Sequence, residues 1–253
     1  MICAIMQPTY MPWIGYFDLI DRVNLFIFLD TAQLVRRSFD VRNRIKTSNG
    51  ELSLTIPVKK TKNRDDTKLC EAEIDYREKW IKKHLSSIEL AYKKSKFFNE
   101  VFPIINDLYN MNYTFLSDFT INIIKNIAIK IGIKTPLLKS SELSNIYEHK
   151  DELLVSICKE TGCNSYLSAR GSAVYIESEK PGGEFTKNGI KLYYHNFEHP
   201  YYNQLYGGFL PFMGIFDLIF NEGFEKSLEI IRSGRREQID YQTYRDKYLI
   251  KRE

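Results

Sequence analysis

The sequence predicts an α/β fold with a parallel sheet, a β-hairpin and a helical insertion, and three observations lead to this. Two short apolar runs, residues 2–6 and 25–29, are typical of buried parallel strands, and the helical spacing of residues 13–20 lies between them. Alternating segments flank Asn49-Gly50, the strongest short signal for a hairpin. Apolar residues at spacings of three and four then predict helices between residues 76 and 133.

The remaining elements follow from the same patterns, taken in chain order. Residues 33–58 form the hairpin region, and the polar stretch 59–68 reads as an exposed loop. Helices are expected from Trp80 to Tyr92 and over 99–111 and 114–131, then strands at 136–138, 165–168 and 190–194. Helices over 152–161 and 215–221 should end at Gly162 and Gly223. We expect a single α/β domain over residues 1–253, with a helical insertion at about 76–133 and a loosely held polar tail at about 233–253.

Composition narrows the class of protein. With 253 residues, 43% hydrophobic and 27% charged, the chain is typical of a globular protein, which excludes wholesale disorder and a small disulfide scaffold. A net charge of +4 is too small to indicate a nucleic-acid partner. The four cysteines match no common zinc or redox spacing, so we expect reduced thiols. The N-terminal apolar run is too short for a signal peptide or a membrane span, and we expect a cytoplasmic protein.

The loop after the first strand is the most informative segment. In open α/β sheets, ligands bind beyond the carboxyl ends of the strands, where a helix N-terminus attracts anions. Aromatic rings in this loop could stack on a base or a sugar, or they could belong to the core, which is the better interpretation of Phe17. The candidate binding residues are Gln7, Tyr10, Trp13, Gly15 and Tyr16.

An arginine-rich segment follows the second strand. Arginines mixed with serine and asparagine can clamp a phosphate or carboxylate, although a solvated strand face is the alternative. The candidates are Asp30, Gln33, Arg36, Arg37, Arg42, Asn43 and Arg44. A short strand also ends at Ser168, and the following Ala-Arg-Gly-Ser could cradle a phosphate with its backbone amides.

Histidines supply the candidates for a general base. His195 and His199 lie in a tyrosine-rich segment just after a predicted strand, where either could serve as a base or be an ordinary loop histidine. Their spacing would suit a metal only on a helix, which Pro200 disfavours, so we predict no metal site. His84 follows Trp80 by one helical turn and is either packed or catalytic.

In combination these segments resemble the WbqC-like family, named from bacterial O-antigen gene clusters. The resemblance extends from Ile5 to about Gly223. Its carrying segments are Gln7-Pro-x-Tyr-x-Pro-Trp-x-Gly-Tyr-Phe17, Asp30-x-x-Gln33, Arg42-Asn-Arg-Ile-Lys46, Leu54-Thr-Ile-Pro-Val58, Trp80-x-x-Lys-His84, Tyr166-Leu-Ser168, Pro200-x-Tyr202-x-Gln204, Phe209-x-Pro211 and Ile215-x-Asp217-Leu. The chain has Gly214 where the family usually has serine, and Phe39 where it often has tryptophan.

A second resemblance concerns the fold. A strand, a loop with Pro-Trp-Ile-Gly-Tyr and a helix are laid out like the start of the Rossmann-like nucleotidylyltransferase (HUP-like) fold. Trp13 and Tyr16 stand where the motif of that superfamily has histidines. The resemblance therefore implies a Rossmann-like sheet in which the usual phosphate-stabilising imidazoles are replaced.

The resemblance to the WbqC-like family implies a role in the biosynthesis of bacterial surface polysaccharides such as O-antigen. The leading hypothesis is a transferase that moves an acyl or aminoacyl group, from an unidentified donor, onto the amine of a nucleotide-linked sugar. The nucleotide would lie over residues 7–16, with Arg42, Arg44 and also Arg37 on its phosphates. His84 or His199 would be the base. Asp30, Tyr202, Gln204 and Asp217 would orient the substrate.

Two alternatives remain open. The first is nucleotidyl transfer to a phosphorylated substrate, with a divalent metal held by Asp30 or Asp217. The second is a non-catalytic subunit that binds a sugar nucleotide or acts as a scaffold. The sequence identifies no cofactor, and a homodimer is compatible with it.

Overall fold

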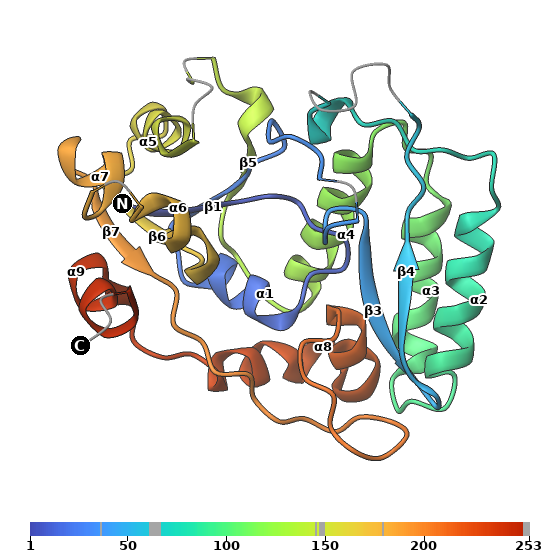
Figure 1. Ribbon diagram of the computed structural model, residues 1–253. Coiled ribbons are helices and arrows are strands. Elements are labelled where there is room, and N and C mark those ends of the chain that lie inside the picture. The colour runs from blue at the N-terminus through green and yellow to red at the C-terminus, as the bar shows by residue number, and fades with distance from the viewer. Residues whose placement is uncertain (36, 61–66, 145, 147–149, 179, 250–253) are drawn as a thin grey trace.

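The computed structural model describes residues 1–35, 37–60, 67–144, 146, 150–178 and 180–249. Its centre is a six-stranded sheet in the order β5-β2-β1-β6-β7-β8 (Figure 1). The strands are β1 (Ile2–Met6), β2 (Leu25–Phe28), β5 (Leu137–Lys139), β6 (Ser165–Ser168), β7 (Lys191–Tyr194) and β8 (Ile239–Asp240). The first five are parallel and β8 is antiparallel to β7. The predicted α/β class with a Rossmann-like parallel sheet is confirmed.

Alternation along the central strands separates two cores, one on each face of the sheet. Ala4 of β1 and Phe26 of β2 point into the larger core, whereas Cys3 and Ile27 point into the smaller one. The larger core contains α1 (Ile14–Asp21), α4 (Leu116–Lys130) and α8 (Ile215–Ser233). The smaller core contains α5 (Lys150–Glu160), α6 (Ala173–Ile176) and α7 (Gly183–Lys187).

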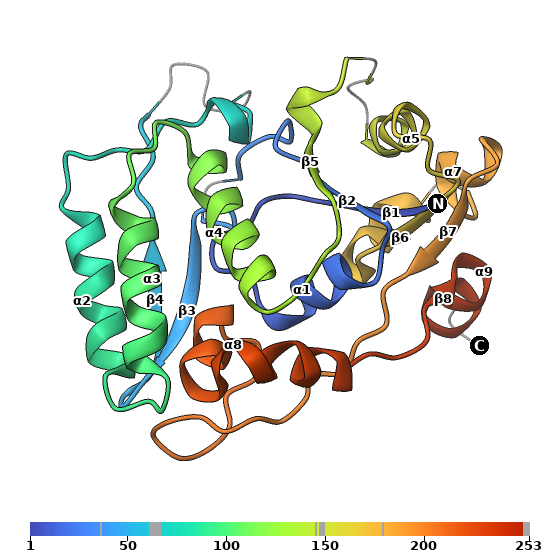
Figure 2. The ribbon, with the colours of Figure 1, turned by 180° about the vertical axis from the view of Figure 1, so that it is seen from behind.

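The predicted hairpin and helical insertion form one end of the molecule. Figure 2 shows β3 (Arg42–Thr47) and β4 (Gly50–Thr55) beside α2 (Trp80–Tyr92) and α3 (Phe98–Asn110), far from α5, α7 and α9 (Tyr241–Tyr244). Gly50 at the turn has φ 96°, which explains the Asn-Gly signal. The hairpin is shorter than expected, because residues 37–41 form turns and a bend rather than a strand. Of the expected loop 59–68, residues 61–66 lie outside the described residues.

The structure adds two C-terminal elements to the sequence expectations. The helix expected to end at Gly223 does break there, where a φ of 78° and a ψ of 169° are not helical, and a second helical segment continues α8 to Ser233. In the segment expected to be a loosely held tail, β8 pairs with β7. Tyr244 packs against Tyr194 with ring centroids 4.3 Å apart. Residues 250–253 lie outside the described range.

The order of the strands creates a switch point beside β1. From β1 the chain adds β2 and then β5 on one side, and later adds β6 and β7 on the other. Loops at the carboxyl ends of β1 and β6 therefore diverge, which leaves the crevice where ligands bind in open α/β sheets. Met6 ends β1 and Ser168 ends β6, so the candidate loops after both strands meet at this edge.

Candidate functional site

Two adjoining pockets lie at the switch point, and Met6, Trp13 and Tyr16 line both of them. We call the first, of about 350 Å³, the switch pocket; its other lining residues include Gly15, Arg170, Gly171, Ser172, His195 and Phe197. We call the second, of about 330 Å³, the apolar pocket; it is also lined by Thr9, Pro12, Phe39, Asn43, Arg44 and Phe212. Trp13 is thus shared by two compartments, one at the sheet edge and one against the hairpin.

The hairpin holds the loop that carries Trp13 through hydrogen bonds from Asn43 of β3. The Asn43 side-chain amide donates to the backbone carbonyls of Tyr10, at 3.0 Å, and Met11, at 2.8 Å. These bonds hold Met11 in a left-handed conformation with φ 44°. Asn43 therefore shapes the site through the backbone, which differs from the phosphate-clamping role expected for it.

The Trp13 indole packs between aromatic rings from distant segments. It meets Phe197 and Phe212 edge-on, with centroids 5.5 and 5.4 Å away, and stacks on His199 at 6.1 Å. Its other face lies over Gly15, where an added Cβ would be only 2.2 Å from the ring. Glycine at position 15 is therefore what allows the indole to cover the start of α1.

Gly15→Ala should displace the indole and lower the free energy of unfolding by about 1–3 kcal/mol, the usual cost of overpacking. Iodide quenching of tryptophan fluorescence should increase, because Trp80 is buried and Trp13 would become more accessible. Gly171→Ala is the matched control in the same pocket, because a Cβ added there would meet no atom within 4 Å. Equal effects of the two substitutions would contradict this account.

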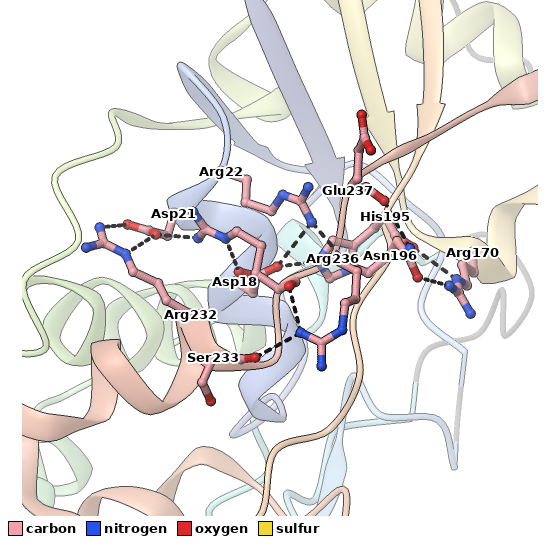
Figure 3. A network of polar contacts seen from close by, with 11 residues as sticks. Asp18, Asp21, Arg22, Arg170, His195, Asn196, Arg232, Ser233, Arg236 and Glu237 are labelled. Carbon is pink, nitrogen blue, oxygen red and sulfur yellow. Dashed lines mark hydrogen bonds and ion pairs between the residues drawn. The ribbon is translucent and has the colours of Figure 1, made fainter.

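His195 lines the switch pocket and is paired with a buried carboxylate (Figure 3). His195, directly after β7, places Nε2 2.7 Å from Oδ2 of Asp18, a fully buried residue of α1. Since a carboxylate accepts, Nε2 donates its proton to Asp18, and Nδ1 has no hydrogen-bond partner among the described residues. An imidazole oriented in this way can take a proton from a bound group.

Arginines compensate the buried carboxylate. Arg235 donates to Oδ1 of Asp18 at 2.8 Å, and Arg22 lies 3.6 Å from Oδ2. Arg235 also pairs with Asp21, which Arg232 binds with two hydrogen bonds. These contacts tie the end of α8 to α1 and fix the position of the His195 ring.

Arg170 also lines the switch pocket and contacts the segment that carries His195. Its Nε donates to the backbone carbonyl of His195 at 3.1 Å, and its Nη2 to the side chain of Asn196 (Figure 3). This guanidinium therefore holds the segment after β7 and also lines the pocket. α1 begins at the pocket without an acidic residue in its first turn, so its N-terminal end is electropositive.

Other residues predicted for the site contribute to it unequally. Trp13, Gly15, Tyr16, Asn43 and Arg44 line the pockets. The backbone carbonyl of Gln7 accepts from the Tyr16 hydroxyl, whereas Tyr10 and Ser168 are fully buried beneath the surface. Gln33, Arg37 and Arg42 are exposed and line none of these pockets, while Arg36 lies outside the described residues.

The two predicted aspartates are bound by protein donors. Asp30 accepts from the hydroxyls of Ser140, at 2.9 Å, and Ser141, at 2.6 Å, and so joins the loops after β2 and β5. Asp217 accepts from Tyr92, at 3.1 Å, and from two residues of the 200–204 segment. No group of three or more histidine, cysteine, aspartate or glutamate side chains in the described part of the chain is placed to hold a metal ion.

Tyr202 and Gln204 belong to this second junction rather than to a pocket. Both donate to Oδ2 of Asp217, at 3.0 and 2.7 Å, and Gln204 also accepts from the buried Lys46. Burial raises the pKa of Asp217. The cluster fixes the loop that carries Phe212, so these residues support the apolar pocket indirectly.

His84 lies in the core. Nε2 donates to the Thr55 carbonyl, 3.1 Å away, and Nδ1 accepts from the Tyr10 hydroxyl at 2.9 Å. Burial lowers the pKa of His84 to about 4. His199, at the edge of the aromatic group around Trp13, donates from Nδ1 to the Pro200 carbonyl, and burial lowers its pKa as well.

The buried neutral His84 should make stability depend on pH. Its pKa is lower in the folded chain than the ordinary value of about 6.5, so the unfolded chain binds more protons between pH 6.5 and 4. His84 should therefore cost about 3 kcal/mol of stability as the pH falls through that range. Urea unfolding from pH 4 to 7.5 tests this: the slope should flatten in His84→Gln, and it should flatten less in His199→Gln, because His199 is only partly buried.

The features that sequence patterns missed are Asp18, Arg235 and Phe212. Asp18 stands within the apolar run of residues 14–20, and this pattern could have indicated the buried ion pair, since a charge in such a run needs a buried partner. The sequence marks His195 as a candidate base, but the leading hypothesis places that role on His84 or His199. No sequence spacing relates residues 18, 195 and 235, which three separate elements bring together.

The fold and the two pockets define a Rossmann-like α/β protein with a candidate ligand site at the switch point of its sheet. This chain belongs to the WbqC-like protein family, whose model matches residues 7–229. It is 34% identical over 224 residues to the uncharacterized protein Rv1507c of Mycobacterium tuberculosis, which covers 88% of this chain and 94% of the relative. No solved structure matches it. Among the described residues, no helix is long and apolar enough to cross a membrane.

Proposed function

We propose that this protein is a transferase of bacterial surface-glycan biosynthesis that moves an acyl or aminoacyl group onto the amine of a nucleotide-linked sugar. The observation that carries the proposal is His195, which lines the switch pocket with Nε2 bonded to the buried Asp18, while Nδ1 has no partner among the described residues. Acyl transfer to an amine needs a base at this kind of position.

The chemistry requires few groups. The sugar amine attacks the carbonyl carbon of an activated donor such as a thioester, and the new C–N bond forms as the bond to the leaving atom breaks. His195 takes the proton from the amine on Nδ1 and returns it to the leaving group. Asp18 keeps the proton of Nε2 in place and stabilises the charged ring. The amide and the released thiol balance the reaction.

We assign the phosphates to the electropositive side of the switch pocket. The N-terminal end of α1 and the Arg170 guanidinium lie there, and both favour anions. This assignment replaces the one made from the sequence. Arg44 is paired with Glu51 at 2.7 Å, and Arg42 is exposed on the hairpin away from the switch pocket.

The test begins with a thermal-shift screen of the full chain against nucleotide sugars, nucleoside triphosphates and acyl donors. A ligand at 100 times its Kd should stabilise the fold by about 2.7 kcal/mol. Arg170→Ala should remove the shift caused by an amino-sugar nucleotide, and Arg42→Ala should retain it. Mass spectrometry should then detect the sugar nucleotide with the added acyl or aminoacyl group.

The screen also separates the alternatives. Pyrophosphate release from a nucleoside triphosphate, a sugar phosphate and Mg²⁺ would replace the proposal with nucleotidyl transfer. Binding of the sugar nucleotide without turnover of any donor would indicate a non-catalytic subunit. Either result would overturn the proposed reaction.

A further inference from the structure

We propose that the apolar pocket holds the aliphatic chain of an acyl donor, which makes simple acyl groups, rather than aminoacyl groups, the ones transferred. This inference rests on the proposed function and specifies its donor. Its basis is a pocket of about 330 Å³ that adjoins the switch pocket across Trp13 and whose polar side chains are mostly engaged within the protein.

Most hydrogen-bonding groups of the apolar pocket are used within the protein. Asn43 donates to two backbone carbonyls and accepts from the Arg44 amide at 2.9 Å. The Arg44 guanidinium donates to Glu51 and to the Phe212 carbonyl. The Tyr16 hydroxyl donates to the Gln7 carbonyl.

What the pocket has left are mainly donors. Nε of Arg44 is buried without a partner, and the indole N–H of Trp13 has none among the described residues. The Thr9 hydroxyl is the unpaired side-chain acceptor among the described residues that line this pocket. A ligand group that must donate hydrogen bonds therefore finds little here to accept them.

This shortage of acceptors disfavours the other natural occupants. A nucleobase carries several donors and acceptors, each of which costs about 1–3 kcal/mol when buried unpaired. The ammonium of an aminoacyl group needs a carboxylate, but no acidic side chain lines the described pocket, and the nearest charge is the arginine cation of Arg44. An alkyl chain needs neither hydrogen-bond partners nor a carboxylate, and its transfer out of water into the pocket lowers the free energy.

The opening of the pocket is apolar as well. Phe39 and Phe212 line it and remain 59% and 50% exposed, although each could bury a large area. Exposed aromatic side chains around a hollow are typical of a surface completed by an apolar ligand. Since Met6, Trp13 and Tyr16 line both compartments, a chain held here ends beside the pocket that contains His195.

N-alkanoyl glucosamines with chains of two to eight carbons are the probes, with binding to the full chain measured by calorimetry. Each methylene that enters the pocket should lower Kd about fourfold, until the chain fills it and the affinity levels off. Phe39→Ala and Phe212→Ala should flatten this dependence. Tyr201→Ala is the matched control, because this exposed aromatic lines neither pocket.

The outcomes separate this inference from the proposed function. A Kd that does not depend on chain length, or tighter binding of N-alanyl than of N-propanoyl glucosamine, would overturn the acyl-chain pocket even if transfer occurs. Uridine, which has no phosphate, competing more strongly with the octanoyl probe than with the acetyl probe would assign the pocket to a nucleobase instead. A steep dependence without turnover of any donor would support the pocket and count against the transferase.

Discussion

Asp18→Ala is expected to lower the free energy of unfolding by about 3–5 kcal/mol, the usual cost of removing one partner from a buried ionic cluster. The carboxylate is fully buried and is shared by His195, Arg22 and Arg235. Without it, two guanidinium groups and an imidazole are left close together, and in the described part of the chain Asp21 is the remaining carboxylate that pairs with Arg235. This is a substantial share of the roughly 5–15 kcal/mol that stabilises a typical domain.

Urea unfolding followed by circular dichroism measures the effect at pH 7.5. Glu225→Ala, an exposed acid on α8, is the control and should change stability by less than about 0.5 kcal/mol. Asp18→Asn keeps the size of the side chain and one acceptor, so it should lie between the control and Asp18→Ala. A loss below about 1 kcal/mol for Asp18→Ala would show that the cluster is not the anchor between α1 and α8.

The main elements of the sheet and the insertion could be predicted because local patterns determine them. The apolar runs at β1 and β2 have one interpretation in a chain of this size, and the Asn49-Gly50 turn fixes the register of the hairpin. β8 has only two residues, too few to show an alternating hydrophobic pattern. Its pairing with β7 depends on the position of the chain at the end of α8. Gly223 predicts the end of a helix because glycine readily adopts the positive φ found there, whereas the second helical segment, which continues to Ser233, was not predicted.

The candidate site was harder to predict, because a polar residue in a loop can either bind a ligand or hydrogen-bond to buried groups of the protein. The two roles cannot be distinguished in a sequence. Asp30 and Gln204 form hydrogen bonds with hydroxyl, amide and ammonium groups inside the protein. A packed α/β protein needs such partners wherever long loops bury polar groups. His84 likewise bonds with both ring nitrogens inside the core. The first strand–helix loop does line both pockets, since the position of a switch-point crevice follows from strand order.

His195→Ala should reduce turnover of the amino-sugar nucleotide by about 10²–10⁴-fold, the usual effect of losing a general base, with KM changed far less. His195 lines the switch pocket, and one nitrogen of its imidazole is bound to Asp18. Loss of the imidazole removes the proton acceptor but leaves Arg170 in place to bind phosphate. His199→Gln and His84→Gln are the matched controls and should retain most of the activity. Added imidazole should partly restore His195→Ala, which a purely structural role would not allow. Full activity in His195→Ala, or a loss confined to KM, would remove His195 as the base.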